Sequence, residues 1–164
     1  MERAKIAIIL IILGYVISLF IGLASWLIIF GIILMVFTRN DYTYLHKRCV
    51  LFSICFFIAL LGITAMLIYH SPYSPDAEFI ARFISSYGLI LVLVTLVYGL
   101  ETTMGRNLCF ATIFSSFLAH GLLFVSYYAM NIFNFIAQIL ILIIYFIAYK
   151  NVATLKAQIA KQEE

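Results

Sequence analysis

Polar side chains follow one face of the apolar segment 107–129. Cys109, Thr112, Ser116, His120 and Tyr127 are separated by 3, 4, 4 and 7 residues, which is the spacing of a single stripe on an α-helix. Polar groups at membrane depth are costly, so such a stripe is expected to face the interior of a bundle or a water-filled cavity. The sequence places His120 near the middle of this segment.

The next segment, 131–149, carries a second stripe. Asn131, Asn134, Gln138 and Tyr145 are separated by 3, 4 and 7 residues. A tight turn near Asn131 would make the two segments neighbours, so their stripes are expected to face each other or a shared cavity.

A third polar group precedes both stripes. Glu101 is the only carboxylate near a helix interior, and it lies close to one membrane boundary with Arg106 five residues further on. It is either one half of an interfacial ion pair with Arg106 or a functional carboxylate. Together with the stripes it defines a candidate ligand-binding site made of Ser116, His120, Tyr127, Asn134, Gln138 and Glu101.

A purely structural interpretation of these residues stays open. Ser, Thr, Asn and Gln commonly hold membrane helices together by hydrogen bonds between them. His120 fits three roles: a structural hydrogen-bonding group, a ligand or proton-path residue, or a metal or haem ligand. The haem role needs a second axial ligand at the same depth, and His46 and His70 lie at opposite segment ends.

Motifs for catalysis are missing from the sequence. It contains no facing pair of carboxylates, no Ser-His-Asp order, no HExxH motif and no GxxxxGK phosphate loop. Cys49, Cys55 and Cys109 are odd in number and form no CxxC pair, so they indicate neither a disulfide framework nor a zinc site. We therefore expect no enzymatic activity, no metal and no cofactor.

The composition requires that helices in a membrane position these side chains. Of the 164 residues, 66% are apolar and 10% are charged, against about 45–50% and about 25% in soluble domains. A soluble domain of this size cannot bury so much apolar surface. Runs such as Ile6–Leu13 are apolar at every position, whereas the strands of a membrane barrel alternate. The sequence predicts one all-α transmembrane domain over 1–164.

Six apolar segments can be drawn, and the charges between them favour counting each as a span. Nine of the ten Lys and Arg residues then fall on one side, leaving Arg82 alone on the other. By the positive-inside rule both termini are cytoplasmic, in what we expect to be the plasma membrane. The chain becomes three hairpins, closing near Gly22, in a longer outer loop at 70–78, and near Asn131. The segments are 6–21, 23–37, 49–69, 80–100, 107–129 and 131–149.

Two alternatives concern the first 37 residues. Residues 6–37 would make one helix of about 48 Å against a hydrocarbon core of about 30 Å, and that reading would move Arg39, Lys47 and Arg48 to the outer side. The first twenty-odd residues also resemble a signal peptide, with Gly22-Leu23-Ala24 as the cleavage site. We prefer a true first span.

The segment ends carry helix signals. In the outer loop Ser74 is a candidate N-cap, with Pro75 at the first helical position. The polar tail 150–164 is expected to extend the last helix into the cytoplasm. His46-Lys47-Arg48 is the only dense basic group, which is too small for nucleic-acid binding.

These observations lead to an accessory or interaction subunit of a larger membrane assembly, whose partners are the bilayer and other membrane subunits or further copies of the chain. The alternative is a small-molecule binding or transport module with its site between the last three helices. Both prolines lie in the 70–78 loop, so the broken helices that many transporters use are not indicated. A membrane enzyme is disfavoured because an acid–base set is missing.

Overall fold

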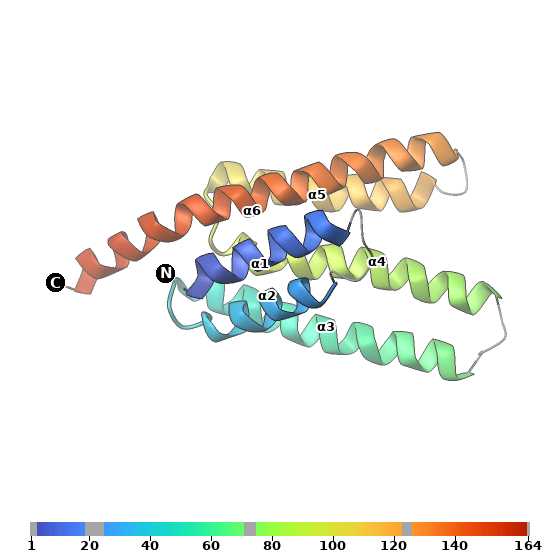
Figure 1. Cartoon of the computed structure of the whole chain (residues 1–164), viewed down its shortest axis with the longest axis horizontal. Coiled ribbons are helices and arrows are strands. Elements are labelled where there is room, and N and C mark those ends of the chain that lie inside the picture. Colours follow the sequence, from blue (N-terminus) through green and yellow to red (C-terminus); the bar gives the residue numbers. More distant parts are fainter. Residues whose placement is uncertain (1–2, 19–24, 71–74, 123–125, 164) are drawn as a thin grey trace.

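The computed structural model describes residues 3–18, 25–70, 75–122 and 126–163 (Figure 1). Within these ranges the chain is helical and contains no strand, which confirms the all-α prediction. The helices are α1 (Arg3–Ser18), α2 (Ser25–Phe37), α3 (Tyr44–His70), α4 (Pro75–Tyr98), α5 (Thr103–Gly121) and α6 (Tyr127–Glu163).

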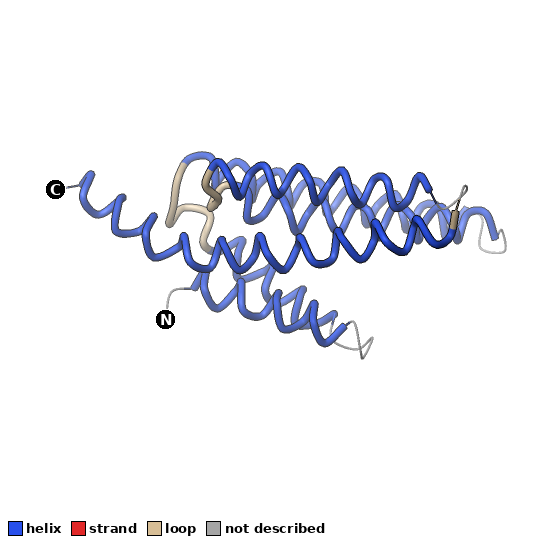
Figure 2. The backbone as a smooth tube through the Cα atoms, turned by 90° about the horizontal axis from the view of Figure 1, so that it is seen from above, coloured by secondary structure: helices blue, strands red, loops and turns tan. Residues whose placement is uncertain are grey.

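Consecutive helices pair as three hairpins, as the sequence predicts. Each helix packs most extensively on its hairpin partner, α1 on α2, α3 on α4 and α5 on α6 (Figure 1). Seen from above, the α1–α2 hairpin lies to one side of the longer helices (Figure 2). Helix α4 contacts both α5 and α6, and α1 contacts α6, so α4 and α6 join the hairpins into one bundle.

The predicted closing points have different outcomes. Gly22 and the proposed N-cap Ser74 lie outside the described residues, whereas Pro75 is the first residue of α4, as expected. The prediction of a tight turn near Asn131 is wrong. Helix α5 ends at Gly121 and α6 begins at Tyr127, so Asn131 belongs to the second turn of α6.

Glycines allow α1 and α2 to approach closely. A Cβ added to Gly31 would lie 2.8 Å from the carbonyl oxygen of Ala7, and one added to Gly14 would lie 2.8 Å from the backbone nitrogen of Ile28. Small residues at such positions let two helix backbones approach closely and gain van der Waals contact. The α1–α2 hairpin is therefore held by backbone-to-backbone proximity.

The core runs through the bundle between α1, α4 and α6. Val92, Leu93, Leu96 and Val97 of α4 are buried, as is Tyr145 of α6. The Tyr145 hydroxyl donates a hydrogen bond to the carbonyl oxygen of Leu93 at 2.8 Å. This bond satisfies the polar end of an otherwise apolar side chain and fixes the register of α6 against α4.

Two described helices are long and apolar enough to cross a membrane, over Tyr44–Tyr69 in α3 and Tyr128–Ile159 in α6. Only 11% and 28% of the residues in their most apolar stretches are buried. A core helix of a soluble protein would be mostly buried, so these exposed apolar faces point to a lipid environment. Helix α6 continues past the bundle at its C-terminal end, as the predicted extension of the tail requires (Figures 1 and 2).

Candidate functional site

The polar stripe predicted on α5 faces the interior of the bundle. Cys109, Thr112 and Ser116 are buried and His120 is partly buried. Thr112 donates its hydroxyl to the carbonyl of Leu108 at 2.8 Å, within its own helix. The Ser116 hydroxyl is buried and has no hydrogen-bond partner among the described residues. The phase of the helix is therefore as predicted, although these contacts stay within α5.

His120 occupies a different depth from the one expected. It lies in the last turn of α5 and not at the middle of a span, because the helix ends at Gly121. Its Nδ1 lies 2.7 Å from the carbonyl oxygen of Ser116. A carbonyl oxygen can only accept, so Nδ1 donates in this contact and Nε2 is the nitrogen left for another partner.

Two aromatic rings of α4 hold the imidazole of His120 from the side. The centroids of Phe83 and Tyr87 lie 4.9 and 5.7 Å from the imidazole centroid, both in edge-on arrangements. Together with the bond to the Ser116 carbonyl, these contacts restrict both the orientation and the tautomer of the ring. His120 thus presents a defined nitrogen at the end of the α4–α5 interface.

The α6 stripe is divided by the structure. Asn134 and Gln138 are partly buried, Tyr145 is fully buried in the α4–α6 core, and Asn131 is exposed. Asn131 therefore does not belong to an inward-facing stripe. The spacing predicted the inward direction of the other three residues correctly, whereas Asn131, in the second turn of α6, faces outward.

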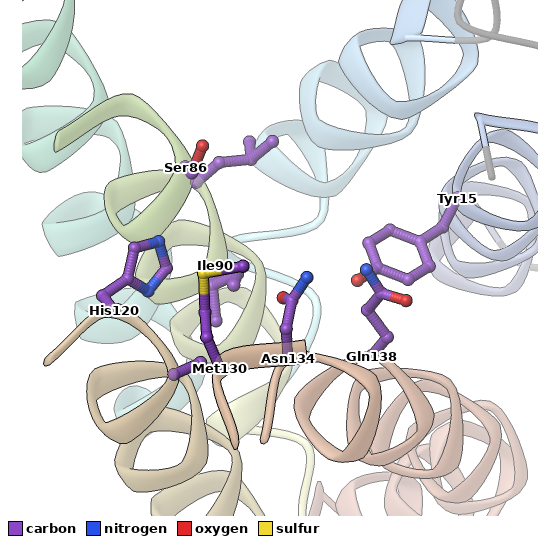
Figure 3. Close-up of a pocket in the computed structure, with 9 residues that line it drawn as sticks. Tyr15, Ser86, Ile90, His120, Met130, Asn134 and Gln138 are labelled. Atoms are coloured by element: carbon purple, nitrogen blue, oxygen red, sulfur yellow. The ribbon is translucent and has the colours of Figure 1, made fainter. Parts of the chain in front are cut away.

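His120, Asn134 and Gln138 line one pocket of about 320 Å³. Figure 3 shows their side chains directed toward this space, with the Gln138 amide near the ring of Tyr15. Neither Asn134 nor Gln138 makes a hydrogen bond to another described residue. The pocket is lined by Tyr15, Ser86, Leu89, Ile90, Ala119, His120, Met130, Asn134 and Gln138.

Sequence reasoning missed two polar residues of this pocket. Tyr15 comes from α1, which contacts α6 although the two helices lie at opposite ends of the chain. Ser86 comes from α4, where the run Ser85-Ser86-Tyr87 interrupts an apolar helix. That polar run was a usable signal. Tyr15 stands alone among apolar residues and gave none.

The pocket is equipped to hydrogen-bond an uncharged molecule and contains no side chain with a permanent charge. None of its nine lining residues is Asp, Glu, Lys or Arg. The two amides each offer donors and an acceptor, each of the two hydroxyls offers a donor and an acceptor, and His120 offers Nε2. Leu89, Ile90, Ala119 and Met130 supply an apolar wall. This mixture is typical of small-molecule sites.

Glu101 lies away from this pocket, contrary to its grouping with the other candidate residues. It follows α4 by three residues, and the eight residues of helical rise from Ile90 to Tyr98 already span about 12 Å. The side chain is 4% exposed. Its Oε2 accepts a hydrogen bond from Asn151 Nδ2 at 3.3 Å, while Oε1 is buried without a partner.

The surroundings of Glu101 favour the protonated acid. Burial raises the pKa of its carboxyl to about 7, against the opposing effects of nearby backbone N–H groups and of Arg106. A Cβ at Gly105, in the first turn of α5, would collide with this carboxylate. Arg106, the expected ion-pair partner, influences the carboxyl group of Glu101 through its charge. The residue that hydrogen-bonds Glu101 is Asn151 of α6.

Tyr127 is the last of the residues predicted to form the ligand-binding site. The side chain of Tyr127 lies outside the described residues. Among the described residues no group of three or more His, Cys, Asp or Glu side chains is placed to hold a metal ion. The chain matches no protein-family model, and no curated protein or solved structure is significantly similar to it.

Proposed function

We propose that this chain is a multi-pass membrane protein that binds an uncharged small molecule between α1, α4, α5 and α6. The supporting observation is that polar side chains from four helices gather around one pocket of about 320 Å³. Helix-to-helix adhesion would instead pair the two stripes directly, as Tyr145 pairs with Leu93. The side chains of Asn134 and Gln138 are instead partly buried and line the pocket, where a bound molecule would complete their hydrogen bonds.

The chemistry of the lining sets the class of ligand. Burying a formal charge without a counter-charge is strongly unfavourable, and the lining holds no Asp, Glu, Lys or Arg. The volume lies at the small end of ligand pockets, which run from about 300 to 1,000 Å³. A compact neutral molecule fits best, with an amide-like edge toward Asn134 and Gln138 and a ring or alkyl part against Ile90 and Met130.

The membrane arrangement proposed with this site has six crossings and cytoplasmic termini in the plasma membrane. It is supported by the nine-to-one division of basic residues and by the arrangement in Figure 1, where α1 begins and α6 ends at the same end of the bundle. Helix α2 has 13 residues, about 20 Å, so it is shorter than the hydrocarbon core. A locally thinned bilayer accommodates such a helix.

Ligand-dependent thermal stability tests the binding proposal. The purified protein in neutral detergent is melted with uncharged ring amides such as nicotinamide, and with the matching carboxylates such as nicotinate. A ligand present at 100 times its Kd stabilises by about 2.7 kcal/mol. We expect the stabilisation to be confined to uncharged compounds and to be lost in Asn134→Leu.

Asn131→Leu is the matched control for that experiment, because Asn131 is one turn away on α6 and exposed. It should respond to ligand as the unmodified protein does. If neither class of compound shifts the melting temperature, or if Asn134→Leu responds fully, the binding proposal is wrong.

A second candidate function, an accessory subunit, is favoured by the exposed surface of α3. Ile58, Leu61, Met66 and Ile68 are each more than half exposed. Such a face suits lipid or the helix of a partner protein equally well. A photo-crosslinking residue at Ile58, activated in native membranes, should capture one defined protein if α3 docks a partner, and lipid alone if it does not.

A further inference from the structure

A second pocket lies on the other side of the bundle and is almost entirely apolar. It occupies about 220 Å³ between α2, α3 and α4, and Ile29, Ile33 and Val36 of α2 form one wall. Ile54 and Phe57 of α3 and Leu96 of α4 form the rest. Ser53 also borders it, but its hydroxyl donates to the carbonyl of Val92 at 3.5 Å. This groove can accommodate a hydrocarbon chain and has nothing to offer a polar ligand.

Basic side chains continue the groove at the end where α2 joins α3. On α3, Lys47, Val50, Ile54 and Phe57 are spaced by 3, 4 and 3 residues, so Lys47 lies on the helix face that lines the groove. Lys47 is exposed, and two helical turns, about 10.5 Å, separate it from Ile54.

Arg39 continues the groove on the α2 side, as Lys47 does on the α3 side. The backbone N–H of Arg39 donates to the carbonyl of Val36 at 3.3 Å, so the chain continues in a tight helical turn past the end of α2. Arg39 is exposed and follows Val36 by three residues, the next position on the groove-lining side. Two cations thus lie at one end of an apolar groove, one on each wall.

Three other polar groups near this end have the following surroundings. The guanidinium of Arg48 lies over the Tyr44 ring, 4.4 Å from its centroid. Thr38 is buried and donates to the carbonyl of Met35 at 2.7 Å. Asp41 is exposed and is the single acidic residue between α2 and α3. The segment 38–48, with Arg39, Lys47 and Arg48 against Asp41, keeps a net charge of +2 when His46 is neutral.

We propose that this groove is a binding site for an anionic phospholipid of the cytoplasmic leaflet. One acyl chain lies between α2 and α3, and the phosphate lies between Arg39 and Lys47. Charge complementarity selects the occupant, because an exposed basic pair at the membrane surface attracts an anionic headgroup while the groove accepts only hydrocarbon. The proposal rests on the membrane placement given above and is independent of the pocket that contains His120.

Native mass spectrometry of the detergent-solubilised protein tests this site. The protein is titrated with phosphatidylglycerol and with phosphatidylcholine of identical acyl chains. Two basic groups near an anionic headgroup predict a preference for phosphatidylglycerol of roughly 30-fold, corresponding to about 2 kcal/mol. The double variant Arg39→Gln/Lys47→Gln should lose this preference, whereas Lys156→Gln/Lys161→Gln, which removes two exposed charges from the α6 tail, should keep it. Inorganic phosphate should not displace the lipid.

A second pair of variants tests the acyl-chain groove separately from the headgroup. Ile54→Trp fills the groove and should weaken binding of both lipids, while Ile58→Trp, one turn away and 63% exposed, should not. Equal binding of the two lipids to the unmodified protein, or an unchanged preference in the Arg39/Lys47 variant, would overturn the proposal. Unchanged binding in Ile54→Trp would overturn it as well. None of these three results bears on ligand binding at Asn134.

Discussion

Replacing Glu101 by Gln removes the one buried carboxylate among the described side chains while keeping its shape. The amide oxygen can still accept a hydrogen bond from Asn151, so the local geometry is retained. What changes is the proton. The native side chain takes one up as it becomes buried, and the Gln side chain does not, so the substitution isolates the pH dependence that this single group contributes to stability.

The pKa of Glu101 sets both the sign and the size of the effect. Burial raises the pKa from 4.5 to about 7. Between these two values the folded protein binds one proton more than the unfolded chain, so the free energy of unfolding falls as pH rises through this window and levels off above it. A difference of about 2.5 pKa units corresponds to about 3 kcal/mol, with 1.36 kcal/mol for each unit.

The assay is thermal unfolding in neutral detergent from pH 5 to pH 8.5. For a chain of this size about 3 kcal/mol corresponds to roughly 6–12 °C. His46 acts in the opposite direction, because burial lowers its pKa from 6.5 to about 4 and the free energy of unfolding therefore rises with pH between these values. This contribution is common to both proteins, so the informative quantity is the difference between their melting temperatures. As pH rises, that difference should move by up to about 6–12 °C in favour of Glu101→Gln, which should be the more stable protein at pH 8.5. Parallel curves for the native protein and Glu101→Gln would refute this account of the buried carboxyl.

Three further predictions concern packing and topology. Gly31→Ala should lower the melting temperature, because its Cβ would meet α1, whereas Gly62→Ala, with nothing within 4 Å, should be neutral or raise it slightly. Tyr145→Phe should destabilise by about 1 kcal/mol in the same melting assay, because a buried α4 carbonyl loses its donor. In a cysteine-free background, a cysteine at Ser74 should react with a membrane-impermeant reagent added to intact cells, and one at Arg39 should not. Labelling of both positions would contradict the six-span topology.

The sequence predicted the helix phase better than the helix ends. The inward direction of Cys109, Thr112 and Ser116 followed from their spacing alone, because the cost of polar groups in an apolar environment acts residue by residue. The depth of His120 did not follow, since apolar residues continue past the point where α5 stops. Gly121 is the residue type that most often ends a helix, and it was the available signal.

Contacts between distant helices could not be predicted in the same way. Asn151 reaches Glu101 across 50 positions, and Tyr15 meets the pocket through the packing of α1 on α6. Neither pairing leaves a periodic trace in the sequence. Arg106, the near neighbour, was therefore the expected ion-pair partner of Glu101, whereas the side chain that hydrogen-bonds Glu101 in the structure is that of Asn151.

The central claim is that the pocket lined by His120, Asn134 and Gln138 holds an uncharged small molecule. The most direct test is mass spectrometry of the small molecules released when the protein, purified from its native membrane in mild detergent, is denatured. We expect one neutral compound to be released in near-equal amounts from the native protein and from Asn131→Leu, and to be absent from Asn134→Leu. Release of no compound from the native protein, or of the same compound from all three proteins, would contradict the claim.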